Sequence, residues 1–126
     1  MNIEKLSFNE ACEKTGRNPE QALRYAKPAN SEEEAANALD RLKIFTEAYN
    51  MVDGKKWEPD YSNSNQAKWW AWFRYDGSLR AFVFYVTFND CTHAAAGAGS
   101  RLVSRTSEIA RFIGVEHIDD WNKWLS

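Results

Sequence analysis

Two runs of aromatic and β-branched residues dominate the hydrophobic pattern of this chain. They occupy residues 68–75 and 79–88, and the short polar sequence Asp76-Gly77-Ser78 separates them. Asp-Gly between two such runs is a strong signal for a β-hairpin, because both central residues of a type I′ turn need a positive φ. The pattern therefore predicts a hairpin over residues 68–88 that turns at Asp76-Gly77.

A two-residue turn also fixes which side chains share a face of the predicted hairpin. Opposite residues then have numbers that sum to 153, and successive side chains point to alternate faces. One face carries Trp69, Phe73, Tyr75, Phe82, Phe84, Val86 and Phe88, and the other carries Trp70, Trp72, Leu79, Val83 and Tyr85. Since both faces are apolar, either helices cover both of them or one face is open as a binding surface.

Two short helices are predicted near the start of the chain. Ser7 and Glu10 have the spacing of a capping box, in which the serine caps the helix and the glutamate reaches back to the cap. Asn18-Pro19 predicts a second start, because asparagine caps well and proline fits the first helical position. We expect this second helix to end near residue 25.

A long helix is predicted next. Ser31-Glu32-Glu33-Glu34 matches a second capping box, and its carboxylates suit the positive end of the helix dipole. Asp53-Gly54 is predicted to end the helix, and a polar loop follows over residues 55–67. Apolar residues recur along the helix every three or four positions, which indicates one buried stripe: Ala35, Ala38, Leu39, Leu42, Phe45, Tyr49 and Val52.

The C-terminal part of the chain is predicted to complete the sheet and then cover it. Residues 100–104 are suited to a third strand, which a hairpin needs because two strands alone are marginally stable in water. Ser104 or Thr106 then caps a closing helix, and Gly114 is expected to interrupt it. The expected fold is a single α+β domain over residues 1–126, with N-terminal helices, a three-stranded antiparallel sheet and a C-terminal helix packed on the sheet.

Composition limits the class of protein to which this chain can belong. The chain has 126 residues, of which 44% are hydrophobic and 27% charged, as in an ordinary globular domain. We expect a cytoplasmic location, because no apolar run is long enough to span a membrane and the first residues lack the pattern of a signal peptide. Cys12 and Cys91 lie in different predicted elements, so we expect both to stay reduced.

Charge is unevenly distributed along the chain. Residues 1–54 hold 7 basic and 10 acidic side chains, residues 55–105 hold 7 and 4, and residues 106–126 hold 2 and 4. The middle segment is therefore basic between two acidic flanks, although the net charge is −2. This is a weak hint of an anionic partner, well short of the strongly basic surface of a dedicated nucleic-acid binder.

No motif in the sequence indicates a chemical reaction, a metal or a cofactor. Cys91 and His93 are candidate metal ligands, or a nucleophile with its base, but a chain with two cysteines and two histidines offers no zinc-site spacing. The small-residue loop over 94–100 with Arg101 is an alternative anion site, although it lacks the pattern of a phosphate-binding loop. We therefore expect a protein that is not an enzyme.

Four short motifs resemble a group of small uncharacterised proteins encoded by bacteria of the Bacteroides group and their phages. The motifs are Trp57-Glu58-Pro59-Asp60, Trp72-Phe73, Gly99-Ser100-Arg101-Leu102 and Ser107-Glu108-Ile109-Ala110. The resemblance covers roughly residues 40–126, and the chain departs from it in the alanine-rich loop and at Gly114. It implies a phage or prophage origin, with the host cytoplasm as the location, and supplies no activity or cofactor.

Two functions fit these observations. The first is a non-catalytic accessory module that binds another protein or a second copy of itself through the aromatic hairpin. The alternative is binding of single-stranded nucleic acid, in which aromatic rings stack on bases while Lys55, Lys56 and the arginines of the basic segment neutralise phosphates. The candidate binding residues are Trp70, Trp72, Arg74, Arg80, Tyr85, Arg101 and Arg105.

Overall fold

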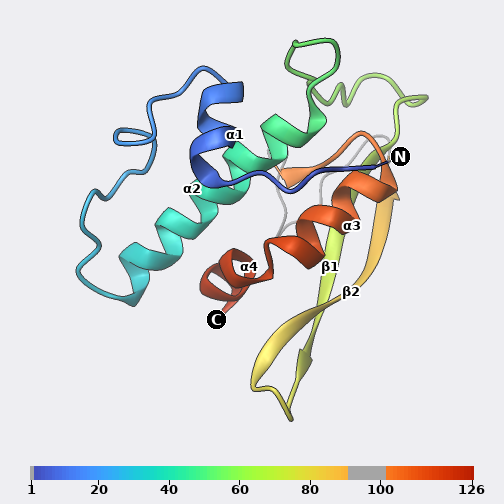
Figure 1. Ribbon diagram of the computed structural model, residues 1–126. Coiled ribbons are helices and arrows are strands. Elements are labelled where there is room, and N and C mark those ends of the chain that lie inside the picture. Colours follow the sequence, from blue (N-terminus) through green and yellow to red (C-terminus); the bar gives the residue numbers. More distant parts are fainter. Residues whose placement is uncertain (1, 91–101) are drawn as a thin grey trace.

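The computed structural model describes residues 2–90 and 102–126, and within them the chain forms four helices and a two-stranded antiparallel sheet (Figure 1). The hairpin forms one layer, α3 and α4 lie against one of its faces, and α2 packs on the other side of these two helices with α1 beside it. The predicted α+β class is confirmed. The elements are α1 (Phe8–Lys14), α2 (Ser31–Asn50), β1 (Lys68–Asp76), β2 (Ala81–Asp90), α3 (Ser107–Glu116) and α4 (Ile118–Leu125).

The first predicted helix is confirmed and the second is wrong. Ser7 and Glu10 form both hydrogen bonds of the capping box at the start of α1. Residues 18–25 contain turns and no helix. The backbone there is held by α2 instead, because Asp40 accepts hydrogen bonds from Arg24 and the Asn37 side chain pairs with the backbone of Tyr25. These tertiary contacts outweigh the local preference for a helix.

The long helix is confirmed with different ends. Asn30, one residue before the predicted cap, accepts a hydrogen bond from the Glu33 amide, so Ser31 is the first helical residue. The helix ends at Asn50, because the next residue is extended, and Asp53-Gly54 forms a separate turn with positive φ at both residues. None of the helices in the described part of the chain is long and apolar enough to cross a membrane.

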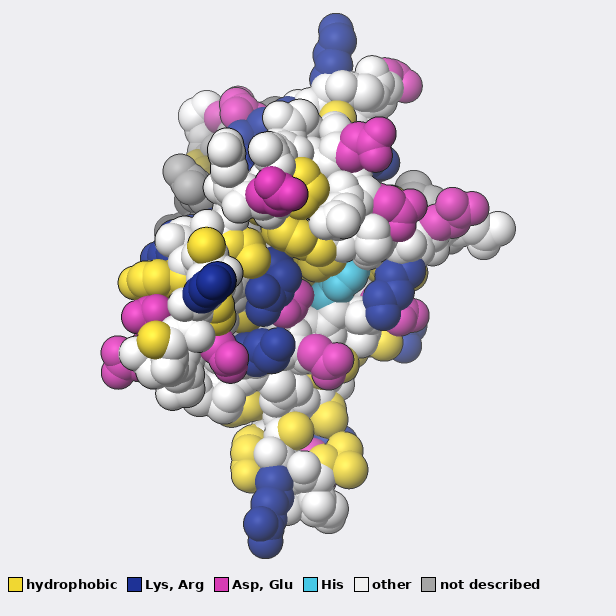
Figure 2. Space-filling view, turned by 60° about the vertical axis from the view of Figure 1, so that its left-hand side comes forward, with side chains coloured by type: hydrophobic (Ala, Val, Ile, Leu, Met, Phe, Trp, Pro, Cys, Tyr) yellow, Lys and Arg dark blue, Asp and Glu magenta, His cyan; other side chains and the backbone are white. Residues whose placement is uncertain are grey.

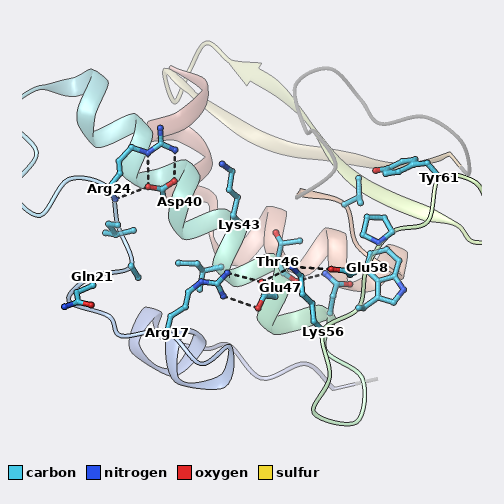
Figure 3. A pocket seen from close by; sticks show the side chains of 17 residues that line it. Arg17, Gln21, Arg24, Asp40, Lys43, Thr46, Glu47, Lys56, Glu58 and Tyr61 are labelled. Atoms are coloured by element: carbon cyan, nitrogen blue, oxygen red, sulfur yellow. Dashed lines mark hydrogen bonds and ion pairs between the residues drawn. The ribbon is translucent and has the colours of Figure 1, made fainter.

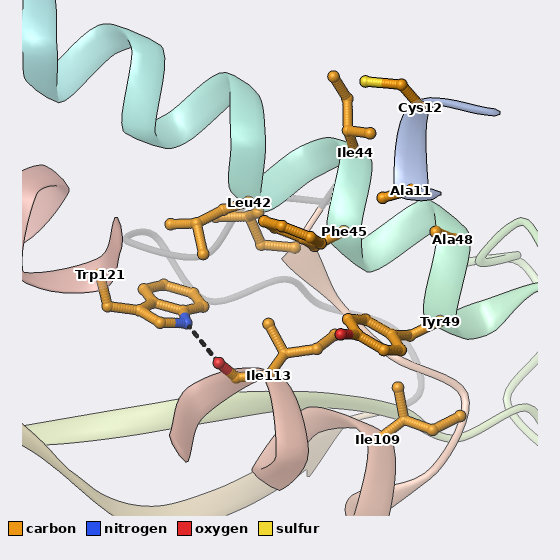
Figure 4. Packing of buried hydrophobic residues seen from close by; sticks show 11 residues of the cluster. Ala11, Cys12, Leu42, Ile44, Phe45, Ala48, Tyr49, Ile109, Ile113 and Trp121 are labelled. Carbon is orange, nitrogen blue, oxygen red and sulfur yellow. Dashed lines mark hydrogen bonds between the residues drawn. The ribbon is translucent and has the colours of Figure 1, made fainter. Parts of the chain in front are cut away.

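The core lies between α2 and the two C-terminal helices (Figure 4). Leu42, Phe45 and Tyr49 of the predicted stripe are buried there, against Ile109 and Trp121. Val52, the last residue of that stripe, is exposed because the helix has already ended. The remaining buried members are Ala11, Cys12, Ile44, Ala48, Leu102 and Ile113, and Cys12 is a free thiol.

The hairpin is confirmed, but its turn and its register differ from the prediction. The loop has four residues, 77–80, and Asp76 pairs with Ala81. Asp76 accepts hydrogen bonds from the amides of Ser78 and Leu79, and the positive φ falls on Arg80 rather than on Gly77. The aspartate side chain thus stabilises a longer turn than the two-residue type I′ form.

A β-bulge in β2 shifts the register a second time. Phe73 pairs with Phe84 and Trp72 pairs with Val86, which leaves Tyr85 as an extra residue without a partner. Beyond this point Val86 and Phe88 share a face with Trp72 and Trp70, whereas the sequence had placed them on the opposite face. The prediction for these two residues was therefore wrong.

The predicted third strand is also wrong for the residues that the structure describes. Ser104 makes two backbone hydrogen bonds with Trp69, which form an isolated bridge and no longer ladder. Along β1 the ladder would continue from Ser104 to Leu102, which lies in a 3₁₀ turn instead. In the other direction Arg105 does not extend it, because its amide donates to the Asn50 side chain and its guanidinium to the Asn50 carbonyl. Residues 100 and 101 lie outside the described part of the chain.

The predicted closing helix is interrupted and consists of two helices, α3 and α4. Thr106 caps α3, and the chain changes direction at His117 rather than at Gly114. Gly114 instead lies against the hairpin, where a Cβ atom would come within 2.8 Å of Phe84 Cδ1. Trp121 is buried, donates a hydrogen bond to the Ile113 carbonyl and packs its ring 4.6 Å from Phe73.

Candidate interaction surface

One face of the hairpin is covered by the C-terminal helices. Ala71 and Phe84 contact Gly114 of α3, Phe73 contacts Trp121 of α4, and Thr87 hydrogen-bonds the Ser107 side chain. The helices therefore cover one of the two apolar faces of the hairpin and leave the other uncovered by helices. Side chains alternate along a strand, so the residues between these point away from α3 and α4.

We call the other side the open face, and it consists of Trp70, Trp72, Arg74, Val83, Tyr85, Val86 and Phe88. Three of its aromatic side chains are exposed by about half: Trp72 by 49%, Tyr85 by 56% and Phe88 by 47%. The Phe88 ring lies edge-on to Trp72, 5.7 Å away, and 6.3 Å from the ring of Trp70. The open face is therefore a connected aromatic cluster that solvent reaches.

Apolar side chains that do not belong to the open face are also exposed, at the end of the hairpin. Tyr75 and Leu79 are 58% and 67% exposed there. Figure 2 shows the end of the hairpin projecting beyond the helices at the bottom of the view, with hydrophobic side chains gathered on it and a basic residue at its tip. A projecting element with this composition is suited to contact another macromolecule.

The structure brings together four of the seven binding residues predicted from the sequence. Trp70, Trp72, Arg74 and Tyr85 all belong to the open face, and Arg74 is exposed there opposite Val83. Phe88 is a member of the open face that was not predicted, because the bulge that turns it to this side leaves no recognisable signal in the amino-acid pattern.

The predicted basic residues do not form one stripe. Arg80 lies in the hairpin turn, whereas Arg105 is held at the end of α2 by Asn50. Lys56 lies within 3.7 Å of both Glu47 and Glu58, so its charge is already partnered. Arg101 lies outside the described part of the chain, as do Cys91, His93 and the small-residue loop considered as an anion site.

A second surface feature, which sequence analysis missed, is an open groove of about 810 Å³ beside α2 (Figure 3). Asp40, Lys43 and Glu47 of α2 line it, and Trp57 and Tyr61 of the following loop close one end. The recurrence of polar residues on α2 at positions 40, 43 and 47 is a signal that could have revealed a polar strip on this helix.

Most of the charged side chains in this groove form ion pairs. Arg24 binds Asp40 with an N···O distance of 2.7 Å, and Arg17 makes two hydrogen bonds to Glu47 of 3.0 and 3.1 Å. Burial favours a higher pKa for both carboxyl groups, but the hydrogen bonds and charges of the arginines outweigh it and hold both pKa values below their usual range. These ion pairs hold residues 17–24 against α2. They also leave little unbalanced charge in the groove for a ligand to bind.

Among residues 2–90 and 102–126, no three His, Cys, Asp or Glu side chains gather in a way that could hold a metal ion. His117 is buried and hydrogen-bonds Tyr49, with 2.8 Å between Nε2 and the phenol oxygen, and Tyr49 also accepts from the Leu6 amide. This pair lies in the core and connects three segments of the chain.

Comparison with known proteins found no relative of this chain. No family model, curated protein or solved structure matches this chain.

Proposed function

We propose that this chain is a non-catalytic accessory module that associates with protein, either another chain or its own copy, through the open face of the hairpin. The observation that carries this proposal is the half-exposed cluster of Trp72, Tyr85 and Phe88 on the side of the hairpin away from the helices. Burying large aromatic side chains contributes much of the free energy of protein association.

The charge on this surface supports protein contact better than nucleic-acid binding. A strand of nucleic acid needs several cations along the track of its phosphates, next to the stacking rings. Arg74 lies on the open face and Arg80 at its end, but Arg105 and Lys56 are bonded elsewhere in the structure. An aromatic surface with one or two arginines is typical of a protein interface, in which aromatic residues and arginine are enriched. The phage or prophage setting stays a prediction of the sequence resemblance.

Site-specific photo-cross-linking in the cell tests the proposal. A benzophenone amino acid is placed at Trp72 or at Phe88, and as controls at Val52 and Val115, which are hydrophobic and exposed by 43% each elsewhere on the molecule. We expect discrete protein adducts from the two hairpin positions and none from the two controls. The mass of an adduct distinguishes a second copy of this chain from another protein.

Three outcomes contradict the proposal. Equal adducts at all four positions would show nonspecific contact, and no adduct at Trp72 or Phe88 would show that this face has no partner. Adducts with nucleic acid in place of protein would favour the alternative function. In that case tryptophan fluorescence should change when a short single-stranded oligonucleotide is added, and the affinity should fall steeply as salt increases.

A further inference from the structure

The free end of the hairpin, residues 74–85, is apolar on both of its faces. Tyr85 belongs to the open face, whereas Tyr75 lies on the other face and packs edge-on against Phe82, with 5.4 Å between the ring centroids. More than half of each tyrosine is exposed, because the hairpin projects beyond the helices (Figure 2). Leu79, in the turn between the strands, is exposed as well. A partner on the open face alone would leave Tyr75 and Leu79 in water.

The open face also carries an arginine without an ion pair. Arg74 is exposed and belongs to none of the ion pairs that the described residues form. Asp76 is the only acidic residue between positions 69 and 89, and its Oδ1 already accepts two amide hydrogen bonds within the turn. A partner that covers the neighbouring Trp72 would also remove water from Arg74, and burying a charge without an opposite charge is costly. The partner therefore has to supply a carboxylate at this point.

The opposite face has cations of its own. A shallow depression of about 250 Å³ lies where the end of the hairpin meets α4, and Arg80 and Lys123 are the charged side chains among the described residues that line it, beside Tyr75. Both are exposed, and neither takes part in an ion pair in the part of the chain that the structure describes. The side chain of Asn122, which also lines the depression, binds the backbone of Phe82. This face therefore offers a second place for a partner's carboxylate.

We propose that the free end of the hairpin inserts into a cleft of a different protein, and that both walls of this cleft carry carboxylates. One wall covers Tyr85 and pairs with Arg74. The other wall covers Tyr75 and pairs with Arg80 and Lys123. This inference rests on the proposed function and adds the shape and the charge of the partner. A cleft buries aromatic side chains on both faces of the hairpin at once, which a flat surface does not, and charge-assisted hydrogen bonds to the cations fix its orientation.

A second copy of this chain is unsuited as this partner. The groove beside α2 is a hollow that a second copy would offer, but its carboxylates Asp40 and Glu47 are already held by Arg24 and Arg17. An incoming arginine would have to displace one of these ion pairs. The carboxylates that the hairpin needs therefore come from another protein.

A single strand of nucleic acid fits this arrangement less well than a cleft does. Arg74 lies on the open face, whereas Arg80 and Lys123 line the depression on the opposite face. Phosphates that follow one strand reach the cations on one side of the hairpin and leave those on the other side without a partner. Walls on both sides bring a carboxylate to each cation.

Photo-cross-linking from both faces of the full chain in the cell tests the insertion. A benzophenone amino acid is placed at Tyr75 or at Tyr85, and Tyr25, an exposed tyrosine on the helical side of the molecule, is the matched control position. We expect the two hairpin positions to give adducts with one and the same protein, identified by mass spectrometry of its peptides, and the control position to give none. Adducts with one protein from opposite faces require that the hairpin lies between two parts of it.

Charge reversal tests the acidic walls. Arg74→Glu is combined with benzophenone at Tyr85, and Arg80→Glu with benzophenone at Tyr75. Each reversal should lower the yield of adduct about tenfold or more, because truncating one partner of a buried charge pair at an interface already costs that much. Lys27→Glu is the matched control, since it changes the net charge equally at an exposed residue outside the hairpin, and it should leave the yield unchanged. Arg74→Gln should give an intermediate yield, and circular dichroism checks that each variant is folded.

Adducts from Tyr85 without any from Tyr75 would overturn the insertion and still uphold the proposed function, since the open face would have a protein partner. Equal yields from Arg74→Glu and Lys27→Glu would overturn the acidic cleft. An adduct with twice the mass of 14.5 kDa would identify a second copy as the occupant instead. Adducts with nucleic acid, or no adduct at any hairpin position, would overturn the proposed function as well.

Discussion

Gly114 sets how closely α3 approaches the hairpin. A Cβ atom at this position would lie 2.8 Å from Phe84 Cδ1, closer than Cβ atoms approach other atoms in proteins, and 3.1 Å from the Cβ of Ala71, which is a tight contact. Both neighbours belong to the covered face, so neither side chain can move without disturbing the packing below it. The absence of a side chain at Gly114 is therefore required by packing rather than by backbone conformation.

Gly114→Ala should lower the free energy of unfolding by about 1–2 kcal/mol, because overpacking outweighs the gain in helix propensity. The measurement is urea unfolding followed by tryptophan fluorescence. Gly77→Ala is the matched control, since nothing lies within 4 Å of a Cβ at that position and its φ is not positive. Equal stability of the two variants would show that the contact with Phe84 relaxes without cost.

His117 is a titratable residue in the core. Its ring stacks on Phe45 with 3.8 Å between ring centroids, and its Nε2 is hydrogen-bonded to Tyr49. Burial, and to a smaller extent the positive charge of Lys5, lowers the pKa of His117 from 6.5 to about 4. Tyr49 also accepts from the Leu6 amide, and a neutral imidazole forms the Tyr49–Nε2 hydrogen bond in either tautomer.

This pKa predicts that the protein loses stability on mild acidification. The unfolded chain binds a proton at His117 as the pH falls below about 6.5, whereas the folded chain does so only near pH 4. The stability is thus fully present above 6.5, and between pH 7.5 and 5 the free energy of unfolding should fall by about 2 kcal/mol. Unfolding curves at these two pH values measure it. His117→Gln should reduce the difference, and an unchanged pH dependence in that variant would assign it to other groups.

The start of α2 shows how an element is positioned by one residue. Asn30 accepts a hydrogen bond from the Glu33 amide, while Ser31 is already helical. Asn30→Ala should therefore cost about 1 kcal/mol of stability, and Ser31→Ala should change it by at most a few tenths. Thermal unfolding of the two variants makes the comparison. The reverse order of the two effects would restore Ser31 as the cap.

Local signals predicted most of the elements. The Ser7–Glu10 capping box, the long helix and the hairpin are each determined by residues close in sequence, and each is present. The helix expected after Asn18 is absent because Asp40 and Asn37, far along the chain, hold that backbone in turns. Contacts of this kind are not encoded in local spacing.

The faces of the hairpin were predicted only in part, for a similar reason. The register depends on a four-residue turn stabilised by the Asp76 side chain, and then on a bulge at Tyr85. The four-residue loop shifts every pair by an even number, so Phe73 and Phe84 still share a face, but the bulge adds one residue and reverses Val86 and Phe88. The sequence therefore predicted the aromatic cluster of the open face, but it did not predict that Phe88 is a central member.

All the described helices lie on one side of the hairpin (Figure 1). The chain uses α3 and α4 to cover one apolar face and stacks α2 and α1 behind them. A hairpin packed on one side only leaves an exposed aromatic face. This face follows from the topology, and association with protein accounts for it.

Hydroxyl-radical footprinting tests this account most directly, by comparing the chain inside cells with the dilute purified chain. Trp72, Tyr85 and Phe88 are the positions of interest, and Tyr25, an aromatic residue exposed by 39% on the helical side, is the internal control. The account predicts that the three open-face side chains react readily in the dilute protein and are protected in the cell, while Tyr25 reacts equally in both. Equal reactivity of the open-face residues in the two settings would contradict it.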